Sequence, residues 1–221
     1  MKQPLQYGLI FLYVVVCTLQ LIACAQPKLF RLRRLTKCLL MPVLALCYVA
    51  CARTFSALVL IGILCGFVGD ALLLHPENPT RFAGGLAAFA VGHICYAIHM
   101  LLLRSAAPAW WVTAIAIALY MALIWLIMSK LRRDLPQSFV VPCLAYMLVI
   151  CLMSFAALLL LINWRTINAA LLFIGSLLFM VSDTVLAFDT FRTRPVRHGG
   201  ILIMGTYILA QTLIVCGLLF M

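Results

Sequence analysis

The sequence predicts an all-α polytopic membrane protein with eight transmembrane helices. Apolar residues make up 67% of the 221 residues, and Asp, Glu, Lys and Arg only 10%. This composition excludes an ordinary soluble domain. The apolar residues form long continuous runs without the alternation of a barrel strand, so each run must satisfy its backbone hydrogen bonds internally as a helix.

Eight runs are predicted to cross the bilayer. Their limits are 6–25, 38–52, 55–74, 82–103, 109–128, 138–162, 167–188 and 199–220. The second is short for a crossing, and we expect it to continue into its flanks. No segment between the runs is long enough for a separate domain, so residues 1–221 are expected to form one transmembrane domain.

The basic residues predict the orientation of the chain. One side receives those of segments 28–37, 130–133 and 192–197 together with Arg81, whereas the other receives Lys2, Arg53, Arg104 and Arg165. The positive-inside rule places the richer side in the cytoplasm and both termini outside. The basic residues behind the net charge of +11 therefore set the orientation in the membrane, and no nucleic-acid partner is expected. The expected location is a bacterial inner membrane.

The spans divide into two similar halves of four, residues 1–104 and 105–221. The matching positions are Pro42 with Pro142, Asp70 with Asp183, and Gly85, Phe89 and Tyr96 with Gly200, Met204 and Gln211. Such a pattern resembles a parallel repeat about an axis along the membrane normal. It predicts a central cavity lined by spans three, four, seven and eight.

Two carboxylates inside apolar spans are the main candidates for a functional site. Asp70 follows Gly62 by eight residues, and Asp183 follows Gly175 by the same interval. A charge near the centre of a span costs at least ~2.5 kcal/mol, so both are expected to face the bundle interior or a wet cavity. Gly62 and Gly66 share the face of Asp70 and allow a neighbouring helix to approach. The alternative is that Asp70 only caps or hydrogen-bonds a neighbour near a helix end.

Four further polar residues are predicted near these aspartates. His93 and Tyr96 share one face of the fourth span, where His93 is either a functional group or a hydrogen-bonded structural residue. Tyr207 and Gln211 are one turn apart in the last span. They either hydrogen-bond across the cavity or join helices.

Lys37 and Arg81 are predicted at the cytoplasmic headgroup level. They either hold an anionic lipid phosphate or only set the topology. The ten cysteines form no CxxC pair and are expected to pack as small apolar residues. No His or acidic pair has diagnostic metal-ligand spacing, so we expect no metal and no cofactor.

The chain resembles the YhhN-type integral membrane family over nearly its whole length. The segments that carry the resemblance are TKCLLMPVLAL, GFVGDALLL, FAGGLAAFAVGHICY, AYMLVICLM, GSLLFMVSDTVLAF and YILAQTLIV. It implies that Asp70 and Asp183 occupy the two intramembrane acidic positions of the family, with His93 and Tyr96 at its span-four histidine and the following aromatic. One departure is Cys38, where members often have proline after the lysine.

Characterised members of this family are lysoplasmalogenases. The resemblance therefore implies hydrolysis of the sn-1 vinyl ether bond of a lysoplasmalogen, a lysophospholipid, to a fatty aldehyde and a glycerophosphoalcohol. Two carboxylates suit such chemistry, one as acid and one as base. Our hypothesis at this point makes Asp70 the acid and Asp183 the base, with His93 and Tyr96 orienting water or holding the phosphoglycerol.

Two other functions use the same residues. Paired carboxylates and parallel halves are also expected in a proton-coupled transporter. A metal-dependent intramembrane hydrolase would combine His93 with the two aspartates.

Overall fold

The computed structural model describes residues 2–104, 106, 108–192 and 196–220. The described residues form helices and loops without any strand, so the predicted all-α class is confirmed. The elements are α1 (Lys2–Ala25), the short 3-10 helix η1 (Pro27–Leu29), α2 (Phe30–Cys51), α3 (Ala57–Leu72), α4 (Pro79–Leu102), α5 (Trp110–Leu131), α6 (Gln137–Trp164), α7 (Ile167–Phe191) and α8 (Gly199–Leu219).

Seven of these helices are long and apolar enough to cross a membrane, and α3 is the exception. The predicted span 55–74 is wrong in length, because α3 has only 16 residues and is about 24 Å long, less than the ~30 Å hydrocarbon core. The chain is extended at Ser56 and leaves the helix at Leu73. The second span does extend into its flank, as expected, since α2 begins at Phe30.

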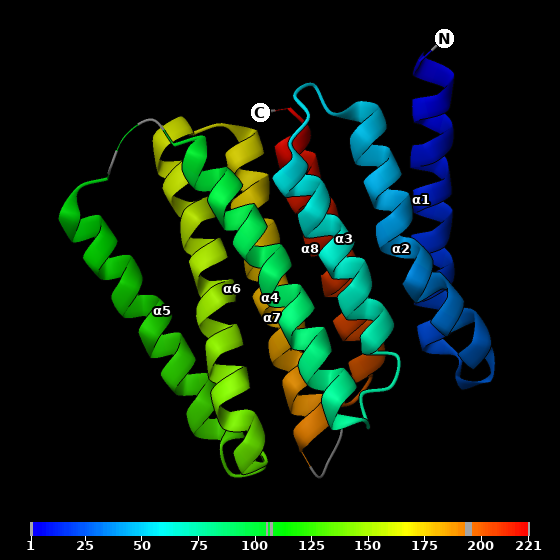
Figure 1. Ribbon diagram of the computed structural model, residues 1–221, viewed down its shortest axis with the longest axis vertical. Helices are drawn as coiled ribbons and strands as arrows, with labels where there is room; N and C mark the ends of the chain where they lie inside the picture. The colour runs from blue at the N-terminus through cyan, green and yellow to red at the C-terminus, as the bar shows by residue number, and fades with distance from the viewer. Residues whose placement is uncertain (1, 105, 107, 193–195, 221) are drawn as a thin grey trace.

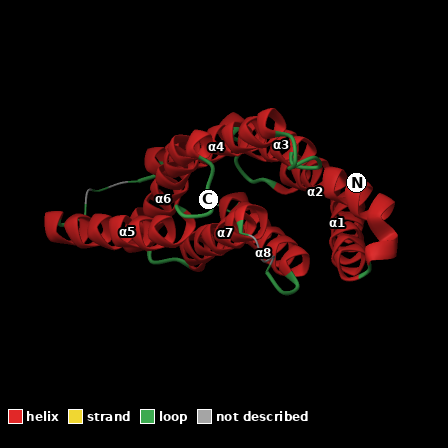
Figure 2. Cartoon of the chain, turned by 90° about the horizontal axis from the view of Figure 1, so that it is seen from below, coloured by secondary structure: helices red, strands yellow, loops and turns green. Residues whose placement is uncertain are grey.

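Seven helices pack in a ring, and α5 lies outside it. Each of α1, α2 and α3 packs on the next helix, and α4 packs on α6. The contacts then continue through α7 and α8, and α8 returns to α1. Figure 2 shows this arrangement as two facing rows of helices, with α5 beside α6 and α7. The ring encloses the polar residues of six helices, whereas α5 contributes only to an outer wall.

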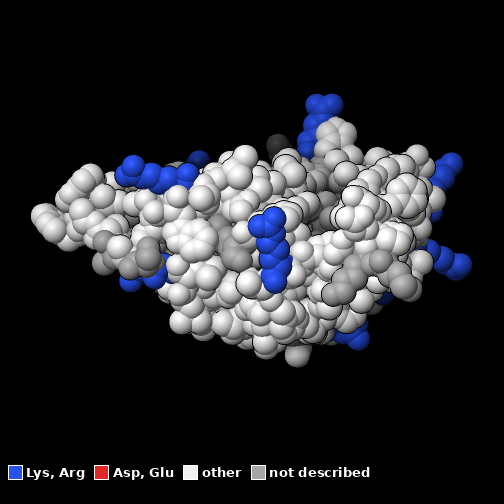
Figure 3. Space-filling view, turned by 90° about the horizontal axis from the view of Figure 1, so that it is seen from above, with Lys and Arg blue, Asp and Glu red and all other residues white. Residues whose placement is uncertain are grey.

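Both termini lie at the same end of the bundle (Figure 1), opposite the loops that follow α1, α3, α5 and α7. Figure 3 looks onto the end with the termini, where Lys and Arg are scattered among uncharged residues and no Asp or Glu is visible. Two basic residues used to predict the orientation are not covered: Arg194 lies outside the described residues, as does the side chain of Lys2.

Glycines set the close contact between α3 and α4. A Cβ atom on Gly62 would lie 2.6 Å from Cε1 of Tyr96, and one on Gly69 would lie 2.6 Å from the Phe89 ring. These rings occupy the space of the missing side chains, so the two helices approach closely. The face of α3 that carries Asp70 is thereby turned into the ring.

Candidate active site

Asp70 lies in the last turn of α3 and is held by two other helices. Its side chain is buried, with 3% exposed. The Tyr207 hydroxyl of α8 donates a hydrogen bond of 2.7 Å to its Oδ2. Nζ of Lys37, on α2, lies 3.7 Å from its Oδ1. The position near a helix end agrees with the simpler sequence interpretation, but the partners of Asp70 come from the neighbouring α2 and from α8.

Asp183 on α7 has a different set of partners. The Tyr146 hydroxyl of α6 donates a hydrogen bond to its Oδ2. Nε2 of His93, on α4, lies 3.2 Å from the same Tyr146 oxygen. The other ring nitrogen of His93, Nδ1, is buried and has no hydrogen-bond partner within the described residues. Tyr146 therefore connects His93 to the carboxylate, and His93 retains one free polar atom.

The structure brings the two carboxylates together. Asp70 and Asp183 lie close enough to interact electrostatically, and the charge of Lys37 acts on both. The Tyr207 phenol donates to Asp70 and also interacts electrostatically with Asp183. Charges act strongly on one another where little water screens them. The predicted pair is thus one cluster formed by α2, α3, α7 and α8.

A second hydrogen bond extends this cluster toward the centre of the ring. The Tyr96 hydroxyl donates to Oε1 of Gln211 at 3.3 Å, which joins α4 to α8. Both side chains are buried. Four of the residues predicted from sequence, Tyr96, His93, Tyr207 and Gln211, therefore all lie in the enclosed part of the ring.

Arg81 lies apart from this cluster. It is exposed in the first turn of α4, where its backbone N–H donates to the Asn78 side chain at 3.1 Å. In the adjoining loop, the pKa of Glu77 lies below its usual value. A backbone hydrogen bond lowers it most, and the hydrogen bond from the His75 side chain and the charge of Arg81 lower it less. The structure thus leaves Arg81 exposed at the end of the bundle opposite the termini.

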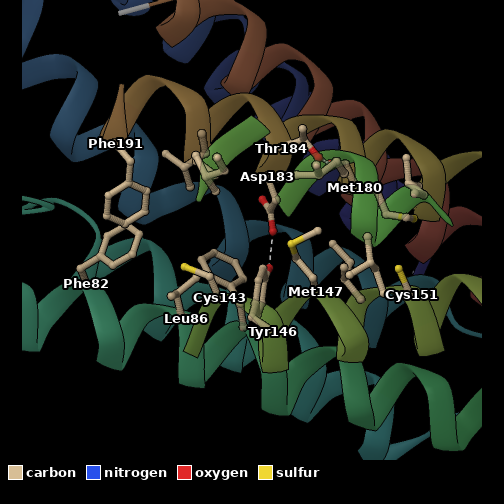
Figure 4. Close-up of a pocket in the computed structure, with 18 of the residues that line it drawn as sticks. Phe82, Leu86, Cys143, Tyr146, Met147, Cys151, Met180, Asp183, Thr184 and Phe191 are labelled. Atoms are coloured by element: carbon tan, nitrogen blue, oxygen red, sulfur yellow. Dashed lines mark hydrogen bonds between the residues drawn. The ribbon is translucent and has the colours of Figure 1, made fainter. Parts of the chain in front are cut away.

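Asp183, Tyr146 and Thr184 form the polar part of a mostly apolar cavity (Figure 4). The cavity has a volume of about 60 Å³ and is lined by α4, α5, α6, α7 and Leu73. This is room for water. The predicted cavity, lined by spans three, four, seven and eight, is therefore wrong in its walls. No described residue of α3 or α8 lines the cavity, and α5 and α6 form walls in their place.

Tyr146 is the residue of this site that sequence reasoning did not single out. It lies four residues after Pro142 in an apolar helix, where a tyrosine is ordinarily a packing residue. Its role follows only from the approach of α6 to both α4 and α7. As to metal ligands, the described part of the chain contains no group of three or more His, Cys, Asp or Glu arranged to hold an ion.

Comparison with known proteins identifies the family. A sequence model of the YhhN family matches residues 32–218, from the first turn of α2 to the end of α8. The chain belongs to the YhhN family. The resemblance seen in the sequence is confirmed, and the match includes every residue of the site described above.

Three curated relatives of this chain are mammalian proteins. The protein named lysoplasmalogenase TMEM86B of Sus scrofa is 34% identical over 187 residues, which cover 81% of this chain and 72% of the relative. The proteins of the same name from Homo sapiens and Mus musculus are 33% and 32% identical, and each alignment covers 69% of this chain. The chain thus spans 59% of the length of the human and mouse proteins. No solved structure matches this chain significantly.

Proposed function

We propose that this protein is a lysoplasmalogenase, an enzyme that hydrolyses the sn-1 vinyl ether bond of a lysoplasmalogen to a fatty aldehyde and a glycerophosphoalcohol. The relatives that bear this name support the reaction. The observation that carries the proposal is the pair of interacting carboxylates, Asp70 and Asp183, of which Asp183 lies in the wall of a cavity with room for water. Vinyl ether hydrolysis needs both a proton donor and a negative charge near the reacting carbon.

The partners of the two carboxylates favour distinct roles. We assign the charged carboxylate to Asp70, because Lys37 lies against it and balances its charge. We assign the proton donor to Asp183, because no Lys or Arg lies within ion-pair distance of it in the described part of the chain. Burial without a counter-charge favours the neutral form of a carboxyl group. This assignment reverses the one we drew from the sequence.

The reaction then balances through these two groups. Asp183 gives its proton to the β-carbon of the vinyl ether, and the resulting oxocarbenium ion is stabilised by the charge of Asp70. Water from the cavity adds to the α-carbon and returns a proton to the carboxylate of Asp183. The hemiacetal that forms collapses into the aldehyde, and its hydroxyl proton passes to the sn-1 oxygen of the glycerol.

The remaining polar residues are positioning groups in this proposal. The free Nδ1 of His93 is available to water or to the glycerol. The hydrogen bond between Tyr96 and Gln211 joins α4 to α8 in the ring interior and stabilises the packing around the aspartates. Arg81 is the more accessible candidate for the lipid phosphate, because Lys37 is already paired with Asp70.

The placement in the membrane and the internal repeat are part of the same proposal. The protein is a single transmembrane domain of a bacterial inner membrane with both termini outside, which the location of both termini at one end supports. The α3–α4 and α7–α8 pairs are each closely packed, in line with two related halves, 1–104 and 105–221. The halves differ in their first helices, because α1 completes the ring and α5 does not.

A comparison of two lipids tests the reaction. Purified protein is incubated with a lysoplasmalogen and with its ester-linked counterpart, and free aldehyde is measured. We expect aldehyde from the vinyl ether alone and a loss of about 10²–10⁴-fold in Asp70→Asn and in Asp183→Asn. Full activity in both variants would contradict the carboxylate mechanism. No aldehyde from folded wild-type protein would favour the proton-coupled transporter instead.

A further inference from the structure

An apolar groove separates α5 from the ring near the end of the bundle that carries the termini. There α5 leans away from α6 and α7 (Figure 1), and the helices enclose a groove of about 380 Å³. Its walls include Trp111, Ala116, Leu119, Leu158, Phe173 and Leu177. This volume falls in the range of sites that bind small organic ligands.

The groove meets the cavity that holds Asp183. Leu123 of α5 lines both of them. The smaller cavity extends from Leu123 toward the end of the bundle that carries Phe82 and Phe191, where Figure 4 shows Asp183 and Tyr146 in its wall. Two apolar cavities therefore lie one after the other along α5 and adjoin at Leu123.

The one hydroxyl group in the walls of the groove is already paired. Tyr120 is hydrogen-bonded to Ser154 at 2.8 Å, and Ser176 donates to Ser154 at 2.9 Å. This chain of hydroxyls joins α5 to α6 and α7. Among the described lining side chains, the other polar group is the Trp111 indole N–H at the end of the groove, so the walls favour a hydrocarbon over a polar occupant.

The length of the groove fits one lipid tail. Leu123 and Trp111 are about 18 Å apart along α5, at 1.5 Å per residue. One leaflet accounts for about half of the ~30 Å hydrocarbon core. A lipid tail that enters the groove past Leu123 therefore extends through most of it toward Trp111.

We propose that this groove, from Leu123 to Trp111, binds the hydrocarbon tail of the lysophospholipid substrate and thereby holds its vinyl ether beside Asp183. The inference rests on the proposed function for the identity of the lipid, but the binding site itself does not depend on catalysis. A single-chain lipid fits because the groove provides one narrow path. The headgroup then remains at the basic end of the bundle, near Arg81.

A pair of tryptophan variants tests the path. Ala116 is buried in the wall of the groove, whereas Ala118 is exposed and does not line it. In Ala116→Trp, the ratio of kcat/KM for a long-chain to that for a short-chain lysoplasmalogen is expected to fall about tenfold, the effect of removing roughly two methylene groups from apolar contact. Ala118→Trp should leave the ratio unchanged. An unchanged ratio in folded Ala116→Trp would overturn the proposal.

Photolabelling tests binding without turnover. The probe is an alkyl-ether lysophospholipid, which lacks the vinyl ether, with a diazirine at the end of its tail. We expect saturable labelling of α5, α6 and α7 around Trp111, Leu158 and Phe173, which excess unlabelled lysophospholipid removes. Uniform labelling of lipid-facing helices, without competition, would mean bulk bilayer contact and overturn the site. Saturable labelling in a protein that releases no aldehyde would keep the site and reject the reaction.

Discussion

The two aspartates differ chiefly in whether a cation balances them, and this difference predicts an effect on stability. Lys37→Met leaves Asp70 buried without its counter-charge and is expected to lower the free energy of unfolding by about 3 kcal/mol. Adding Asp70→Asn to that variant should restore most of the loss, because no unpaired charge remains. Thermal unfolding in detergent measures both. A double variant no more stable than Lys37→Met would show that Lys37 acts elsewhere.

The Tyr146 hydroxyl is expected to matter for activity. Tyr146→Phe keeps the ring but removes the donor to Asp183 and the partner of His93 Nε2. A hydrogen bond to a charged or reacting group contributes about 1.5–3 kcal/mol, so the rate of aldehyde release should fall by roughly 10–100-fold. Tyr13→Phe is the matched control, because its hydroxyl pairs with Thr212 at 2.8 Å, away from the carboxylates. Equal rates in the two variants would remove Tyr146 from the mechanism.

At the scale of single residues, the sequence identifies the polar residues of the site better than it identifies the residues they contact. Asp70 and Asp183 stand out because a carboxylate in an apolar span is costly anywhere except in an interior. The pairing of Asp183 with Tyr146 depends on how α6 and α7 pack, and no local pattern encodes it. The ion pair between Lys37 and Asp70 was missed for the same reason, since Lys37 was expected at headgroup level, either holding a lipid phosphate or only setting the topology.

Among the helices, α3 is the most dependent on close packing. In Gly62→Ala the new Cβ would lie 2.6 Å from the Tyr96 ring, so that ring or the helix must move. We expect a loss of about 1–3 kcal/mol in unfolding free energy. Gly8→Ala is the control, because nothing lies within 4 Å of its Cβ position and alanine favours the helix. Thermal unfolding of the two variants gives the comparison, and an equal Tm would contradict the close contact.

The observed limits of two helices differ from the limits that the apolar runs predict. Apolar runs predicted the locations of all eight helices, because the length of an apolar segment is a local property. The apolar run of α2 begins only at residue 38, and its expected extension proved to be residues 30–37, which are rich in Arg and Lys yet helical. The apolar runs made α3 too long, because Phe55, Leu73 and Leu74 are apolar but lie outside the helix.

At the scale of the whole molecule, the ring of seven helices could not be predicted from the sequence. Hydropathy gives eight similar spans and no reason for α5 alone to stand outside. Contacts distant in the sequence, such as α1 with α8 and α4 with α6, close the ring. What the sequence does predict is the common side of the two termini, because an even number of helices returns the chain to its starting face.

The distribution of basic residues predicts which face that is, and reporter fusions test it. In a bacterial host, alkaline phosphatase fused after residue 220 should be active, because the enzyme folds only outside the cytoplasm. The same fusion within the α5–α6 loop, after Arg133, should be inactive, while a fluorescent protein there should fold. The cytoplasmic loops hold the richer set of Lys and Arg residues, which resists translocation. The opposite pattern would place the proposed headgroup end, with Arg81, on the outer face, and the lipid substrate would then have to enter from the outer leaflet.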